Sequence, residues 1–113
     1  MRHGWFLIAG LTCLSFTGCS RSPRITVRNQ SPETVSNLVV SGTGFTERLD
    51  RLSSGEEHTF RVRPTGESGV SLGFDAGNQH VQSSADGYFE ASGGSRIQAT
   101  IGTNLTVSVE SAP

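Results

Sequence analysis

Apolar and polar residues alternate with a period of two in segments spread along this chain after residue 24. The alternation is found in five segments, at residues 25–28, 59–63, 70–74, 97–101 and 105–109. A period of two puts every second side chain on the same face of an extended strand, so one face is buried and the other meets water. The pattern therefore predicts a series of half-buried β-strands.

Turn-forming residues separate these segments. Asp75-Ala76-Gly77-Asn78 is typical of a tight hairpin with Gly or Asn at positive φ, and Gly102-Thr103 suits a two-residue type II′ turn. A denser apolar segment at residues 35–41 predicts a further strand, and Phe45–Leu49 a short one. Strands recurring every 8–12 residues or so, with no support for a long helix, predict an all-β domain, either a small antiparallel β-sandwich (Ig-like) or a barrel.

The first 20 residues differ from the rest of the chain. They contain both cysteines, Cys13 and Cys19, and the single tryptophan, Trp5. Residues 4–16 are uncharged and mostly apolar. A permanent membrane-spanning helix needs about 20 apolar residues, whereas the apolar part of a secretory signal has about 7–15. The segment is therefore interpreted as an export signal and excluded from the folded domain.

Phe16-Thr17-Gly18-Cys19 resembles the lipobox of bacterial lipoprotein precursors, in which an apolar residue, a small residue and Gly or Ala precede a cysteine. The resemblance implies a helical signal peptide, cleavage between Gly18 and Cys19, and lipidation of the Cys19 thiol by a diacylglycerol, usually with further acylation (palmitate) of the new amino group. Phe16 stands where the family most often has Leu. The alternative is an ordinary secretory signal cleaved elsewhere, which would leave Cys19 as a free thiol.

These features predict three parts: a lipoprotein signal peptide at 1–18, the lipidated cysteine with a short tether at 19–23, and a β-sandwich domain at 24–111. The resemblance implies that the membrane partner is reached through the lipid on Cys19, in the bacterial cell envelope. Because Ser20 and not Asp follows Cys19, the resemblance implies the outer membrane, facing the periplasm, in a Gram-negative cell. In a Gram-positive cell it implies the outer leaflet of the single membrane.

The charged residues and cysteines narrow the expected chemistry of the domain. After Cys19 the chain has no cysteine, so disulfides and thiolate catalysis are excluded there. All nine basic residues are arginines, against ten acidic residues, and they form no polybasic run. Nucleic acid is therefore not an expected partner, and no cofactor is expected.

Catalytic and metal-binding motifs are weak. Gly66-Glu67-Ser68-Gly69 fails the spacing of the serine-hydrolase elbow, and no helix follows it. His58 and His80 are the histidines of the domain, and no spacing links them, whereas a metal site needs several converging ligands. The chain is thus predicted to have no catalytic residues and no metal site. A small-ligand or metal-binding lipoprotein that uses His58, His80 and nearby carboxylates is kept as the alternative.

Four residues make up the predicted interaction surface. Arg61 and Arg63 share one strand face and, with Arg28 or Arg48 nearby, could form a basic patch for lipid headgroups or an anionic partner. Tyr88 and Phe89 point to opposite faces of a strand, so one is expected in the core and the other at the surface. The resulting hypothesis is an envelope lipoprotein with a non-catalytic β-sandwich that binds an envelope protein partner.

Overall fold

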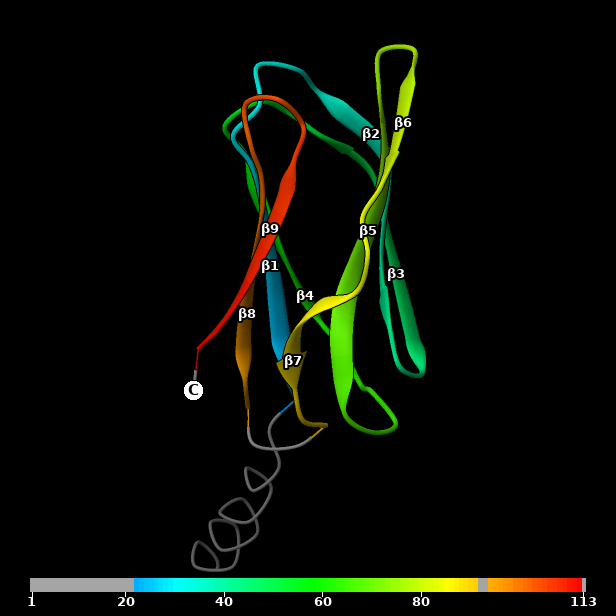
Figure 1. Ribbon diagram of the computed structural model, residues 1–113, viewed down its shortest axis with the longest axis vertical. Coiled ribbons are helices and arrows are strands. Elements are labelled where there is room, and N and C mark those ends of the chain that lie inside the picture. Colours follow the sequence, from blue (N-terminus) through cyan, green and yellow to red (C-terminus); the bar gives the residue numbers. More distant parts are fainter. Residues whose placement is uncertain (1–21, 92–93, 113) are drawn as a thin grey trace, which may run out of the picture.

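The computed structural model describes residues 22–91 and 94–112, and in these residues it contains nine β-strands and no helix (Figure 1). The strands form two sheets that pack face to face as a small β-sandwich, which confirms the predicted all-β class. No helix in these residues is long and apolar enough to cross a membrane. The predicted signal peptide and Cys19 lie outside the described residues.

The first sheet has the strand order β4-β1-β8-β9. Its strands are β1 (Arg24–Asn29), β4 (Glu57–Arg61), β8 (Arg96–Ile101) and β9 (Val107–Ala112). β1 pairs antiparallel with β4 but parallel with β8. The β1–β8 pair is thus the one parallel pairing among the described strands of the predicted antiparallel sandwich. Parallel neighbours need a long crossover connection, and here most of the chain lies between β1 and β8.

The second sheet has the order β3-β2-β5-β6, with β7 also paired to β5. Its strands are β2 (Val35–Gly42), β3 (Phe45–Leu52), β5 (Ser68–Ala76), β6 (Gln79–Gln82) and β7 (Asp86–Phe89). β7 pairs with the first part of β5 and also lies against β9 of the other sheet, where Ser111 Oγ donates to Tyr88 O at 3.0 Å. β7 thus links the two sheets along one side, and β3 and β4 are the edge strands on the other.

The core lies between the sheets and is formed by the apolar phase of the alternating segments. Its fully buried large side chains include Ile25 of β1, Leu38 of β2, Phe74 of β5 and Ile97 of β8. Ile25 and Ile97 each lie on the face opposite to their polar neighbours in the strand, as the period of two requires. Among the described residues no buried side-chain nitrogen or oxygen lacks a hydrogen-bond partner.

Of two predicted turns, the β5–β6 turn has the predicted form and the β8–β9 turn does not. β5 ends at Ala76 and β6 begins at Gln79, with Gly77 at a φ of 60°, so the predicted tight hairpin is confirmed. The two-residue turn predicted at Gly102-Thr103 is wrong, because the β8–β9 turn extends further. Leu105 N donates to Gly102 O at 2.9 Å, and Leu105 itself adopts a φ of 66°.

Candidate functional site

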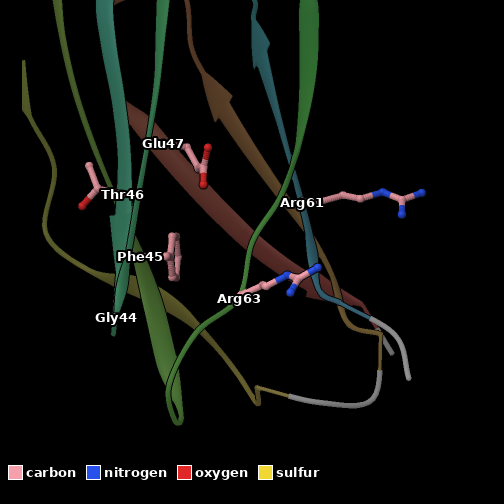
Figure 2. Close-up of a pocket in the computed structure, with 6 residues that line it drawn as sticks. All are labelled: Gly44, Phe45, Thr46, Glu47, Arg61 and Arg63. Atoms are coloured by element: carbon pink, nitrogen blue, oxygen red, sulfur yellow. The ribbon is translucent and has the colours of Figure 1, made fainter. Parts of the chain in front are cut away.

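Arg61 and Arg63 lie at the end of β4, where the edges of the two sheets face each other. They border an open hollow of about 370 Å³ that is lined by Gly44, Phe45, Thr46, Glu47, Arg61 and Arg63. Figure 2 shows Phe45 pointing towards β4, whereas Arg61 extends away from Phe45. Both arginines are exposed, as the sequence predicts. Neither Arg28 nor Arg48 borders this hollow.

The strand register places two other arginines beside Arg61. Arg24 is the register partner of Arg61 on β4 and of Arg96 on β8. Directly paired residues project to the same face of a sheet, and strands lie about 4.8 Å apart. Arg61, Arg24 and Arg96 therefore form a row across three neighbouring strands, here called the arginine row. All three are exposed, on the face opposite to the core.

The arginine row lies where the N-terminal segment joins the domain. Arg24 is the first residue of β1, and its N–H donates to Ser95 O at 3.0 Å. The preceding residue, Pro23, is buried, and its carbonyl accepts from Val62 N at 3.1 Å. The start of β1 is thus hydrogen-bonded on one side to Val62, which lies between Arg61 and Arg63, and on the other side to Ser95, which precedes Arg96.

Within the described part of the chain, no carboxylate forms an ion pair with the arginine row. Among the residues that the structure describes, the only arginine–carboxylate ion pair joins Arg28 Nε and Glu57 Oε2, at 3.5 Å. This pair lies on the same face, further along β1 and β4. Two carboxylates border hollows together with members of the row: Glu47 lines one with Arg61, and Glu110 lines another with Arg96.

Tyr88 and Phe89 of β7 separate as predicted, one outside and one inside. Tyr88 is 58% exposed, and no other large hydrophobic side chain among the described residues is as open to solvent. The carboxylate of Glu67, and more weakly that of Glu90, raises the pKa of the Tyr88 hydroxyl to about 12. Phe89 is buried and packs on Phe45, with ring centroids 6.3 Å apart, so it does not belong to the predicted interaction surface.

Tyr88 and the arginine row lie at the same end of the sandwich. Ser111, whose hydroxyl binds the Tyr88 carbonyl, directly precedes Ala112, and Ala112 is the register partner of Arg96. In Figure 1 this is the lower end, where β1 and β8 begin. Tyr88 and the arginine row thus share one end of the sandwich, with Tyr88 on a strand paired to the second sheet and the row on the first.

The structure does not bring the two histidines together. His58 belongs to β4 of the first sheet, exposed, with its ring edge-on to Phe60 at a centroid distance of 4.6 Å. His80 belongs to β6 of the second sheet, where its Nδ1 lies 2.7 Å from Asp75 Oδ1. Asp75 also accepts from Asn37 Nδ2 at 2.9 Å. Within the described residues no three His, Cys, Asp or Glu side chains cluster as metal ligands.

The residues of the rejected hydrolase motif have a structural role. Ser68 is buried, donates to Gly69 O at 2.7 Å and accepts from Thr43 N at 2.9 Å. Its hydroxyl therefore fixes the loop between β2 and β3 against the start of β5.

Comparison with known proteins supports the fold. The chain is similar to a solved structure described as the NMR structure of the protein from Eubacterium rectale, with a TM-score of 0.52 and 17% sequence identity. The similarity covers 79% of this chain and 86% of that chain. At this identity it shows a shared fold alone. No protein-family model matches the sequence, and a search of curated proteins finds no match.

Sequence reasoning missed Arg24 and Arg96. Each stands at the first position of its strand, and each is followed by a buried isoleucine. That shared position predicts an outward direction for both side chains. It does not predict that the two strands are neighbours, which follows from the topology.

Proposed function

We propose that this chain is a lipid-anchored lipoprotein of the bacterial envelope, and that its β-sandwich is a non-catalytic binding module. One observation carries the proposal: the exposed Tyr88 and the arginine row gather at the end where the chain arrives from Cys19. Tyr and Arg are the side chains that most often dominate protein-binding surfaces. A domain held at this end presents them next to its anchor.

The length of the tether supports this arrangement. Four residues lie between Cys19 and Arg24, so the five steps from one to the other span about 18 Å of fully extended chain at most. Pro23, the last of them before β1, is already fixed to Val62. A lipid on Cys19 would therefore keep the arginine-bearing end of the domain near the membrane surface.

Mass spectrometry of the N-terminal peptide tests the anchor. We expect the mature protein, isolated from the membrane fraction of its bacterial host, to begin at Cys19 and to carry a diacylglycerol on the thiol. Two or three acyl chains, at about 0.8 kcal/mol per buried CH₂, give a stable membrane attachment. Cys19→Ala should remain uncleaved or leave the membrane. An unmodified Cys19 in the wild-type membrane fraction would reject the lipoprotein assignment.

Site-specific crosslinking tests the binding role. A photoreactive residue at position 88 should give an adduct with an envelope protein, whereas the same residue at Thr103, an exposed position in the β8–β9 turn, should not. Adducts of equal yield at both positions would show that Tyr88 marks no particular binding surface.

A further inference from the structure

We propose that the arginine row binds the phosphate groups of anionic phospholipid headgroups, so that the β-sandwich rests on the membrane with this end down. The inference deepens the proposed function and rests on it for the membrane anchor. It assigns a ligand class to Arg24, Arg61 and Arg96, and it fixes the orientation of the domain.

The spacing and chemistry of the row suit phosphate groups. Three guanidinium groups project from one sheet face at successive strands, spaced by about 4.8 Å at the backbone. A guanidinium is a planar fork of N–H donors that binds phosphate oxygens in pairs. Arg63, just beyond the end of β4, adds a fourth exposed guanidinium beside Arg61. The row therefore offers several adjacent forks to a surface of phosphates.

The row is unfavourable for folding unless an external anion neutralises it. Like charges that face each other across paired strands are destabilising. Arg24 has an arginine on both sides. Arg28, four residues further along the same strand, instead faces Glu57 and pairs with it at 3.5 Å. The same sheet thus neutralises one arginine internally and leaves three adjacent ones to a ligand.

The position of the arginine row, whose Arg24 is close in sequence to Cys19, favours membrane lipids as the source of that anion. Arg24 follows Cys19 by five residues. The carbonyl of Pro23 accepts from Val62 N, and Arg24 N donates to Ser95 O, so the start of β1 is fixed beside the outer arginines of the row. A lipidated Cys19 would place these guanidinium groups within reach of the headgroups. The surface potential of an anionic membrane attracts such side chains and falls off within a Debye length, so only charges near the anchor gain from it.

Chemical modification of arginines on vesicles tests the inference. The mature lipoprotein is reconstituted into vesicles of phosphatidylcholine alone or of phosphatidylcholine with phosphatidylglycerol, treated with phenylglyoxal and mapped by peptide mass spectrometry. We expect modification of the arginine row to be slowed about tenfold on the anionic vesicles, with protection declining in high salt. Arg48 and Arg51 are exposed on β3 of the other sheet and serve as internal controls whose rates stay equal.

A single substitution tests whether the row acts as a unit. Arg24→Gln should reduce the protection of Arg61 and Arg96 about fivefold, because each arginine near an anionic surface contributes about that factor. Arg48→Gln is the matched control and should leave their protection unchanged. Equal modification rates of the wild-type row on the two kinds of vesicle would overturn the inference.

Two further arms separate this inference from its alternatives. Inorganic phosphate at the same phosphate concentration should leave the modification rates of the arginine row unchanged. Protection equal to that given by the anionic vesicles would assign the row to a soluble anion and overturn the lipid assignment. The N-terminal peptide in the same digest reports the anchor. Protection with an unmodified Cys19 would reject the lipoprotein proposal and keep the arginine inference. A lipidated Cys19 without protection of the arginine row would keep the lipoprotein proposal and reject the arginine inference.

Discussion

The two ends of β1 show opposite ways of placing polar groups. At one end, Asn29 is fully buried, its amide donates to Glu33 O and Leu52 O, and its Oδ1 accepts from Ser31. At the other end, Arg24 is exposed between two arginines. The first end satisfies every polar atom from within the fold. At the second end, none of the described carboxylates forms an ion pair with the three arginines. Places where a sequence departs from stable local rules are typically functional.

Removing the Asn29 side chain should give the largest effect on stability. Asn29→Ala deletes two donors and an acceptor at a buried position, and unpaired buried groups cost about 1–3 kcal/mol each. We expect a loss of roughly 3 kcal/mol in the free energy of unfolding, measured in denaturant. The control Asn104→Ala removes an exposed contact with Thr106 and should cost less than about 0.5 kcal/mol. Similar losses for both variants would contradict the structural role of Asn29.

At the Arg24 end of β1, removing a charged side chain is expected to raise the free energy of unfolding. Arg24→Gln should stabilise the domain by about 0.5 kcal/mol in uncharged detergent, because it removes a like charge from between two others. The gain should shrink in high salt. Arg28→Gln, which breaks the pair with Glu57, is the matched control and should be neutral or slightly destabilising. A destabilised Arg24→Gln would mean that the row is compensated within the fold.

Tyr88 allows a titration at the same end of the molecule. It is the single tyrosine of the chain, and the only tryptophan precedes Cys19, so the phenolate absorbance of the mature protein reports Tyr88 directly. The nearby Glu67 carboxylate, with Glu90, raises the pKa to about 12, and Glu67→Gln should bring it back towards 10.0. Because the folded pKa is raised, this contribution to stability is present below pH 10 and is lost as the pH rises towards 12. A wild-type midpoint near 10 would contradict this environment.

The smallest effect on stability is expected from the titration of Asp75, which lies on the second sheet. Hydrogen bonds from Asn37, and then from His80, lower the pKa of the Asp75 carboxyl below 3.8. A lowered folded pKa gives stability that is present above pH 3.8 and is lost as the pH falls through the folded value. The thermal midpoint of the wild type should therefore fall in acid slightly more steeply than that of Asp75→Asn. Parallel pH profiles would show that these hydrogen bonds add nothing.

Much of the fold could be predicted from the sequence, because several of its strands bury one face and alternate apolar with polar residues. β1 and β8 follow the pattern, and the hairpin at Gly77 follows from turn chemistry. β6 was missed because Val81 is the only apolar residue of an otherwise polar strand. The alternation also predicted that Tyr88 and Phe89 separate, but the side that is buried depends on where β7 lies.

The arginine row lay beyond sequence reasoning for a different physical reason. Each of its members is an ordinary exposed residue at a strand end, and nothing local distinguishes Arg24 or Arg96 from Arg48. The feature exists only in the register of three strands that are distant in sequence. Long-range pairing is set by the whole topology, so a like-charged row of this kind becomes visible only in the folded molecule.

The most direct test is the stability change caused by Arg24→Gln in the mature lipoprotein on two kinds of vesicle. On phosphatidylcholine vesicles the variant should be more stable than the wild type, because the like-charge repulsion is relieved. On vesicles that contain phosphatidylglycerol it should be less stable, because it loses a phosphate contact of about 1 kcal/mol. A change of the same sign and size on both kinds of vesicle would contradict the account.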